Sequence, residues 1–515
     1  MKKNIIKISL LSAFLGIVGC QDAIDITQDG EITTDVFFSS VDNLQNFLVG
    51  DVYYNAQNAN AIYLTSVLTD EVKPGAGSGG QQFQLHRFFL DPSTSLPANI
   101  WANNYRAINR ATRLIEGAKK VTPTNDTERA TYNDILAQAR TIRALSYLFL
   151  ETYFSEDMTD DNALGVVILN EVPNIDTKLP RSTNKEVFEA MEEDLVFAEA
   201  NLKNTNSRYY ASKNLVYAIR ARLNLYRGKY SEAKTYAQKV IDESGLTLTT
   251  ALPIPSGTVG SSTWNTDFYK DASTSPYRQI WSDNSQGEVV FAFARPQSGG
   301  TYTSIATYYN TNRSSIDGTP MWAMGRNLFN ILNETQGDIR RYAYIDPTST
   351  IDANYLTSQS PLTTDQLIVD KYPGKGSSTS RNDEKIFRLS EMYFILAECA
   401  VNDNDLASAK NYIQQVREAR NYLGLATTPT YATATEAYAD ILKERRVELA
   451  FEGHRYIDLK RLADKAGVTM DRNQTDDVVP VTIIQNGDYR YTLPIPLSEI
   501  AGNSALATQQ NRGYR

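Results

Sequence analysis

Residues 212–244 read SKNLVYAIRARLNLYRGKYSEAKTYAQKVIDES, and this stretch decides the fold. Apolar residues recur at helical spacing from Ala218 to Tyr226 and again from Ser231 to Ile241. Gly228-Lys229-Tyr230 separates the two runs as a tight corner. The pattern predicts two antiparallel helices that need further helices beside them, because one such pair cannot bury its own apolar faces.

The corner of this unit resembles that of a tetratricopeptide repeat. Gly228, Tyr230 and Ala233 match its Gly-x-Tyr-x-x-Ala pattern, in which small residues let two helices approach closely. A second copy spans Arg388–Arg420, with Asn404-Asp405-Leu406 at its corner. Helical spacing predicts further helical segments at Asn43–Tyr54, Asn103–Lys119, Glu128–Phe154, Thr183–Leu202 and Glu436–Leu449. The predicted fold class is therefore mainly α, with a tetratricopeptide-like helical scaffold.

Between the two copies the composition of the chain changes. From residue 246 to about 385 it is rich in Ser, Thr, Gly, Asn and aromatic residues, and Glu288–Phe293 has the pattern of a short strand. We therefore predict a loop-rich lobe with short strands, inserted into a helical scaffold of about residues 36–245 and 386–515. Loops on a rigid scaffold commonly carry binding residues, so the lobe is the predicted ligand-binding region.

Composition narrows the possible functions. The chain of 515 residues has 51 Lys and Arg against 60 Asp and Glu, a formal net charge of −9, which disfavours nucleic acid as a partner. It contains two histidines, His86 and His454, too few for a multi-histidine zinc site and a poor basis for histidine-dependent hydrolysis. The 31 tyrosines, 18 phenylalanines and 4 tryptophans instead favour a binding surface, since aromatic rings supply flat contact area.

The first residues are predicted to be a lipoprotein signal peptide. Lys2 and Lys3 precede an apolar run to Val18 that is too short to span a bilayer. The run leads into LGIVGC at residues 15–20, which looks like a bacterial lipobox, so residues 1–19 would be removed and Cys20 would become an acylated N-terminus. The alternative is an ordinary signal peptide followed by a chance cysteine. The lipid would tie the mature body, residues 20–515, to a membrane.

The charged block Glu444–Arg461 is open to two interpretations. Residues three apart on helical turns suit ion pairs: Arg445 with Glu448, Glu452 with Arg455, and Arg455 with Asp458. Glu448 and Glu452 could also imitate the carboxylate pair of a glycosidase. We favour the structural interpretation, because buried ion-pair networks perturb carboxylates as active sites do. His454 is interpreted in the same way, as a hydrogen-bonded packing residue.

Four blocks of sequence occur in order along the chain. They are Trp101–Arg113, Arg388–Ala400, Glu444–Arg461, and Leu493–Pro496 followed by Gln510–Tyr514. Together with the lipobox, these blocks resemble the SusD/RagB family of Bacteroidetes outer-membrane lipoproteins over essentially the whole chain. Two departures from the family are small: Arg512 stands where the family often has Pro, and Tyr456 where Trp is common.

The resemblance implies a function as well as a fold. It implies a noncatalytic nutrient-binding lipoprotein on the extracellular face of the outer membrane, sitting as a lid over a SusC-like TonB-dependent transporter. The usual ligand is a glycan, the scaffold helices face the transporter, and the loop-rich lobe presents the ligand site. No cofactor is implied, and a structural calcium ion is left open. Two alternatives remain: the same architecture binding peptides or another nutrient, and a surface glycoside hydrolase that uses carboxylates.

A glycan site needs an aromatic platform beside polar side chains, and the lobe supplies both. The candidate ligand-binding residues of the lobe are Trp264, Trp281, Trp322, Tyr269, Tyr277, Tyr302 and Tyr309. The glycine-rich stretch Asp70–Arg87, which reads as a flexible loop, adds Asp70 and His86 as candidates. Trp101 belongs to a family block ahead of a helix and is assigned to the core. For each Trp of the lobe, burial within the lobe is the alternative.

Overall fold

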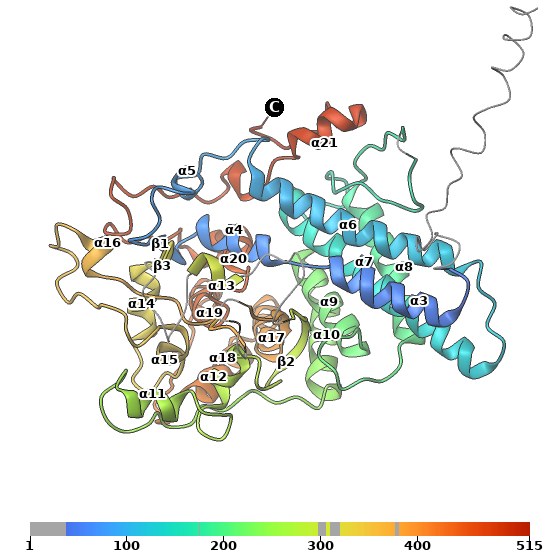
Figure 1. Ribbon diagram of the computed structural model, residues 1–515. Coiled ribbons are helices and arrows are strands. Elements are labelled where there is room, and N and C mark those ends of the chain that lie inside the picture. The colour runs from blue at the N-terminus through green and yellow to red at the C-terminus, as the bar shows by residue number, and fades with distance from the viewer. Residues whose placement is uncertain are drawn as a thin grey trace, which may run out of the picture.

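The computed structural model describes residues 38–174, 176–296, 305–309, 320–375, 378 and 381–514. Cys20 and Tyr302 lie outside these ranges. Helices dominate the described residues and the strands are short, which confirms the predicted mainly α fold (Figure 1). The first half of the chain forms α3 (Val41–Phe47), a π-helical segment η1 (Leu48–Tyr53), α4 (Ala59–Val67), β1 (Val72–Pro74), α5 (Phe83–His86), α6 (Ser95–Ala118), α7 (Asp126–Phe154), α8 (Asn184–Asn201), α9 (Lys213–Tyr226) and α10 (Tyr230–Glu243).

The predicted helix pairs are present. The pair α9 and α10 packs together, and so does the pair α17 (Leu389–Asn402) and α18 (Leu406–Arg420), with α10 against α17. Gly228 turns the first corner with a φ of +70°, a left-handed conformation that glycine adopts without steric strain. Asn404 turns the second corner with a φ of +58°, which asparagine tolerates better than most residues. The helix pairs α6–α7, α7–α8 and α19 (Ala434–Glu448)–α20 (Arg455–Ala466) extend the stack.

The segment between α10 and α17 has the predicted loop-rich character. It contains α11 (Ser262–Phe268), α12 (Pro276–Trp281), β2 (Val289–Phe293), α13 (Ile305–Tyr309), β3 (Trp322–Met324), α14 (Arg326–Leu332), α15 (Arg340–Tyr344), α16 (Pro361–Thr364) and β4 (Glu384–Arg388). The predicted strand at Glu288–Phe293 is confirmed as β2. After α20 follow η2 (Tyr489–Tyr491), α21 (Leu497–Gly502) and η3 (Ser504–Leu506).

Two antiparallel strand pairs tie this lobe to the scaffold. β2 pairs with β4, which runs directly into α17, and β3 pairs with β1, which follows α4. In Figure 1 the long helices α6, α7 and α8 lie on one side of the molecule, the lobe elements α11, α14 and α16 on the other, and α17 and α19 between them. One continuous hydrophobic core contains residues of both parts, among them Leu145 of α7, Leu215 of α9 and Trp281 of the lobe. The lobe therefore packs directly against the helices and shares their core.

Candidate functional site

The three lobe tryptophans lie in the core. Trp264, Trp281 and Trp322 have exposed fractions of 1%, 0% and 0%. Trp264 stacks on Phe268, with ring centroids 4.5 Å apart, and the indole of Trp322 donates a hydrogen bond to the Tyr63 hydroxyl at 2.8 Å. The prediction that these rings form an exposed platform is therefore wrong. Their apolar area stabilises the lobe itself, which is the usual place for such large rings.

Two of the candidate tyrosines are also buried. The Tyr277 and Tyr344 hydroxyls are 2.6 Å apart, and the Tyr309 hydroxyl lies 2.9 Å from Ser66 Oγ. Both rings have an exposed fraction of 0%. Each hydroxyl thus contacts a second buried hydroxyl in the core, and neither ring offers a face to a ligand. The structure contradicts their assignment to a ligand site.

Asp70 and His86 are structural as well. Asp70 accepts hydrogen bonds from Arg455 Nε and Nη2 at 2.8 and 2.7 Å, and His86 Nδ1 lies 3.0 Å from the Val67 carbonyl. Burial holds the pKa of His86 well below its ordinary value, and the nearby Arg472 lowers it further. The stretch predicted as a flexible loop contains β1 and α5. These two candidates are therefore corrected to packing residues.

Among the candidate residues that the structure describes, Tyr269 lines a pocket. It lines an open pocket of about 510 Å³ in the lobe, and its own ring is half-buried. The other lining residues are Gly260, Ser262, Asn265 and Thr266. This set combines one aromatic ring with an amide and two hydroxyl side chains, which is chemistry suited to a neutral polyhydroxylated ligand.

The local sequence explains how α11 builds this pocket. Ser261 caps the helix by accepting a hydrogen bond from the Trp264 amide at 3.3 Å. Trp264 and Phe268, four residues apart, face the core, whereas Ser262 and Thr266 are exposed. Gly260 precedes the cap at a φ of +86°, and a Cβ there would lie only 3.1 Å from the Pro347 carbonyl oxygen. The positive φ and this close approach favour glycine at a position that lines the pocket.

The ring of Tyr269 is held in place from several sides. Its hydroxyl donates to Asp370 Oδ2 at 3.1 Å, and the Arg278 guanidinium carbon lies 5.0 Å from the ring centroid. The rings of Trp264 and Phe268 meet it edge-on. Burial, reinforced by the Asp370 carboxylate, raises the pKa of Tyr269 well above its ordinary value, so the hydroxyl stays protonated. The pocket therefore contains a rigid aromatic group.

Asn265 supplies the other distinctive group of the pocket. Its amide nitrogen donates to the Gly260 carbonyl at 3.3 Å, while Oδ1 is buried and accepts no hydrogen bond from the described residues. A buried acceptor without a donor is unfavourable by about 1–3 kcal/mol. A ligand hydroxyl would satisfy it. Sequence reasoning missed Asn265, although its place on the polar side of α11 could have indicated it.

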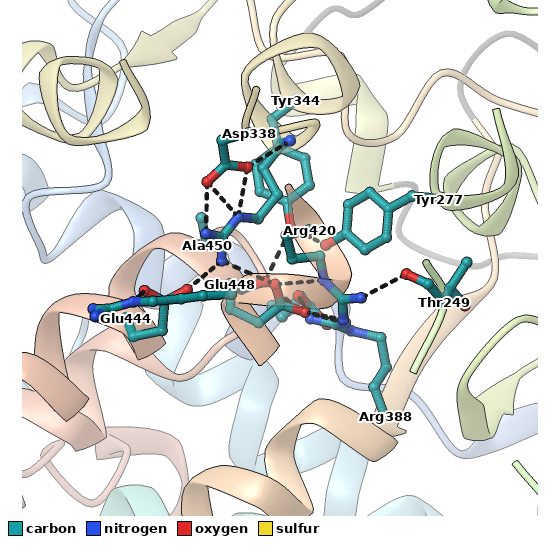
Figure 2. Close-up of polar contacts among 12 residues, drawn as sticks. Thr249, Tyr277, Asp338, Tyr344, Arg388, Arg420, Glu444, Glu448 and Ala450 are labelled. Atoms are coloured by element: carbon teal, nitrogen blue, oxygen red, sulfur yellow. Dashed lines mark hydrogen bonds and ion pairs between the residues drawn. The ribbon is translucent and has the colours of Figure 1, made fainter. Parts of the chain in front are cut away.

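The charged block is a buried ion network. Figure 2 shows Glu448 surrounded by arginines: Arg388 Nη1 donates to Oε1 at 2.7 Å and Arg420 Nε to Oε2 at 3.0 Å. Arg340 Nη1 donates to Oε2 at 3.1 Å. Burial alone would raise the pKa of Glu448, but the guanidinium groups of Arg420 and Arg388 outweigh it and hold the pKa well below its ordinary value. Such a carboxylate cannot serve as a general acid near neutral pH.

The partners within this block differ from the predicted ones. Arg445 pairs with Asp458 at 2.8 Å rather than with Glu448, and Arg455 pairs with Asp70. Glu452 pairs with Lys371 and Arg388, at 2.7 and 2.8 Å. The predicted pairs three residues apart are therefore wrong, although the structural interpretation of the block fits the geometry. His454 is buried, as expected of a packing residue, and burial followed by Arg222 and Arg445 keeps its pKa well below its ordinary value.

The described residues contain neither a metal-binding cluster nor a membrane-spanning helix. No group of three or more His, Cys, Asp or Glu side chains there is arranged to hold a metal ion. In that same part of the chain, no helix has the length and apolar composition needed to cross a membrane.

Known proteins resemble the chain along its whole length. Residues 256–514, more than half of the 515 residues, match the family model described as "SusD family", and residues 24–225 match the model "Starch-binding associating with outer membrane". SusD-like protein P2 of Formosa agariphila is 24% identical, with 100% of both chains covered. A crystal structure of a SusD superfamily protein from Bacteroides thetaiotaomicron is 23% identical, with a TM-score of 0.73, covering 92% of this chain and 99% of that one. A structure from Bacteroides vulgatus described as a SusD-like carbohydrate binding protein is 19% identical, with a TM-score of 0.68, covering 92% and 98%.

Proposed function

The chain belongs to the SusD family, and from this membership we propose that it is a noncatalytic carbohydrate-binding protein of the cell surface. The observation that carries the proposal is the family match over residues 256–514, a range that includes the whole lobe pocket at Tyr269. The similar structure from B. vulgatus, described as a carbohydrate binding protein, supports the same class of ligand. The arginine-bound state of Glu448 fits a protein that holds its ligand without cleaving it.

We place the oligosaccharide in the lobe pocket. The ring of Tyr269 provides a flat apolar surface for the C–H face of a sugar, and its fixed position means that little conformational entropy is lost on binding. Ser262, Thr266 and the unpaired Asn265 Oδ1 supply hydrogen-bonding groups for the hydroxyl rim. These residues fix the orientation of the ligand, and the aromatic contact supplies most of the affinity.

Tyr269→Ala is expected to weaken oligosaccharide binding by about tenfold or more, equivalent to roughly 1.4 kcal/mol, because it removes the aromatic surface of the pocket. Tyr269→Phe keeps the ring and should retain most of the affinity. The ligand is first identified on an oligosaccharide microarray, and its affinity is then measured by isothermal titration calorimetry.

Tyr210→Ala is the matched control for this experiment, since Tyr210 is an exposed tyrosine, 40% accessible, outside the lobe. It should bind like the wild type. Unchanged affinity in Tyr269→Ala would move the site elsewhere. Binding confined to a peptide pool would point to a peptide-binding member of the family, and release of shortened glycan on prolonged incubation would indicate a glycosidase.

The cellular role follows from the family and from the N-terminal residues. We propose that Cys20 is acylated and anchors the protein to the extracellular face of the outer membrane, where it delivers the glycan to a SusC-like TonB-dependent transporter. Cys20 lies outside the described residues, so the support is the lipobox LGIVGC at residues 15–20. The match to the model "Starch-binding associating with outer membrane" supports the location.

Cys20→Ala is expected to abolish acylation and to leave the signal peptide uncleaved at this site, because no other thiol in residues 1–37 could carry the lipid. Metabolic labelling with a fatty acid measures acylation, and the mass of the protein shows whether the signal peptide has been removed. Cys399→Ala is the control, since that thiol is buried in α17 and should not affect labelling. A labelled Cys20→Ala protein with the mass of the mature form would refute the lipobox interpretation.

A further inference from the structure

A second cavity lies in the helical scaffold and shares no residue with the lobe pocket. It has a volume of about 460 Å³ and forms where the end of α7, the corner between α9 and α10, α20 and the segment from Gly487 to Thr492 meet. Its apolar lining includes Met158, Leu225 and Ile457, and four tyrosines, Tyr226, Tyr230, Tyr489 and Tyr491, also line it. The cavity is large enough for a sugar of one or two residues.

Lys460 is the notable charge of this cavity. Its ammonium group donates to the Ser155 carbonyl and to Thr492 Oγ1, both at 2.9 Å. An ammonium has three N–H donors, so one remains without a partner among the described residues. Within the described chain Lys460 also forms no ion pair with a carboxylate, in contrast to Lys371 and Lys73, which each pair with one. Lys460 is therefore a cation in a cavity wall that no carboxylate of the described chain contacts directly.

Two of the other charged side chains around Lys460 are paired with opposite charges. Arg461 pairs with Glu398 and Asp458, and Asp488 pairs with Arg490. Lys465 donates to the Tyr230 hydroxyl at 2.8 Å, and Arg512 is exposed at the rim. The remaining carboxylates are Glu151 behind the wall and Glu156 and Asp157 in the lining. Burial lowers the pKa of Lys460 to about 8, with these three carboxylates opposing the shift, so the side chain is cationic at neutral pH.

We propose that this cavity binds a carboxylate-bearing sugar residue, a hexuronate, whose carboxylate pairs with the Lys460 ammonium. Glu156 and Asp157 are acceptors for the hydroxyl groups of the sugar, and the tyrosines pack against its C–H faces. An acidic peptide fits this lining less well, because it has neither ring C–H faces for the tyrosines nor a rim of hydroxyl groups for Glu156 and Asp157. The site is a second one, separate from the lobe pocket, and extends the proposed function from neutral to acidic glycans.

Isothermal titration calorimetry with trigalacturonate at pH 7 tests the site. The fully methyl-esterified trisaccharide, which has no charge, is the control ligand. The acid should bind at least tenfold more tightly than the ester. Lys460→Met should lower affinity for the acid at least tenfold while leaving the ester unaffected. Raising the pH to 9 should weaken binding of the acid about tenfold, because only about a tenth of the Lys460 side chains would then be protonated.

One further variant keeps the test valid if Lys460→Met does not fold, and two others serve as controls. Thr159→Trp adds bulk at the exposed rim while keeping Lys460, and should lower affinity for the acid by at least tenfold. Lys213→Met, at the far end of α9, is the matched lysine control and should bind like the wild type. Tyr269→Ala should also leave this binding unchanged, which separates the second site from the lobe pocket.

Three outcomes would overturn the proposal. They are equal binding of the acid and the ester, unchanged affinity for the acid in Thr159→Trp, and triglutamate binding more tightly than trigalacturonate. Failure of wild-type protein to bind trigalacturonate would overturn it as well, while leaving the lobe pocket and the proposed function intact.

Discussion

Glu448→Gln is expected to lower the free energy of unfolding by about 3–5 kcal/mol, the range typical of breaking a buried ion pair. Glu448 is fully buried and accepts hydrogen bonds from Arg388, Arg420 and Arg340. An amide of similar shape removes the negative charge but leaves the three guanidinium groups in a buried site. Their remaining partners, among them Glu288 and Asp338, offset only part of this loss.

Equilibrium urea unfolding of the two proteins measures the effect. Glu334→Gln is the matched control, because Glu334 forms an ion pair with Lys443 in which both side chains are about half exposed, and such pairs contribute only about 0–1 kcal/mol. A loss in Glu448→Gln no larger than in this control would show that the network does not stabilise the fold.

The same variant has a defined pH dependence. The folded pKa of Glu448 lies well below the ordinary value of 4.5, so its stabilising contribution is complete above about pH 4.5 and declines as the pH falls through the folded pKa. The difference in stability between wild type and Glu448→Gln should therefore be constant from pH 6 to 8 and shrink in acid. A difference that grows as the pH falls would contradict this assignment of charge.

The helical scaffold was predictable because its signals are local. The α7 helix, expected at Glu128–Phe154, spans Asp126–Phe154, since the Asn125 side chain caps it by accepting from the Glu128 amide. The corner at Gly228 was predictable for the same reason: the left-handed conformation there is a property of one residue and its neighbours. Spacing and capping act within a few residues, and the sequence displays them directly.

The ion partners were not predictable, because they depend on tertiary approach. Spacing along one helix suggested pairs three residues apart, yet Arg388 reaches Glu448 from 60 residues away and Arg455 reaches Asp70 from 385 residues away. Side chains on the buried face of α19 contact residues of other elements rather than neighbours on their own helix. No local sequence pattern indicates which elements these are.

Composition alone could not predict which aromatic residues of the lobe line the pocket, but helical phase helps to distinguish them. Composition marks Trp264 and Tyr269 equally as binding candidates, but one is buried and the other lines the pocket. The difference lies in helical phase, because Trp264 and Phe268 share the core face of α11 while Ser262 and Thr266 face outward. A short amphipathic helix inside a loop-rich segment is therefore the signal that locates a pocket of this kind.

Trp281→Ala is expected to lower the free energy of unfolding by about 3–5 kcal/mol, since it leaves a large cavity in the core. Trp281 has an exposed fraction of 0% and meets the rings of Tyr344 and Tyr372 edge-on. The Lys371 ammonium lies 4.0 Å from its ring centroid, a cation–π contact worth about 2 kcal/mol when desolvated. Both the packing and this contact disappear in the variant.

Trp281→Phe separates these two contributions, because it keeps an aromatic ring and should lose less than half as much stability. Urea unfolding and calorimetric titration with the ligand of the lobe pocket are measured on each variant. Replacing a core tryptophan lowers stability and leaves the affinity of the folded protein unchanged. Replacing a tryptophan that contacts the ligand lowers affinity and leaves stability unchanged. A Trp281→Ala protein that unfolds like the wild type but binds at least tenfold more weakly would return Trp281 to the ligand site and would require the lobe to open around it.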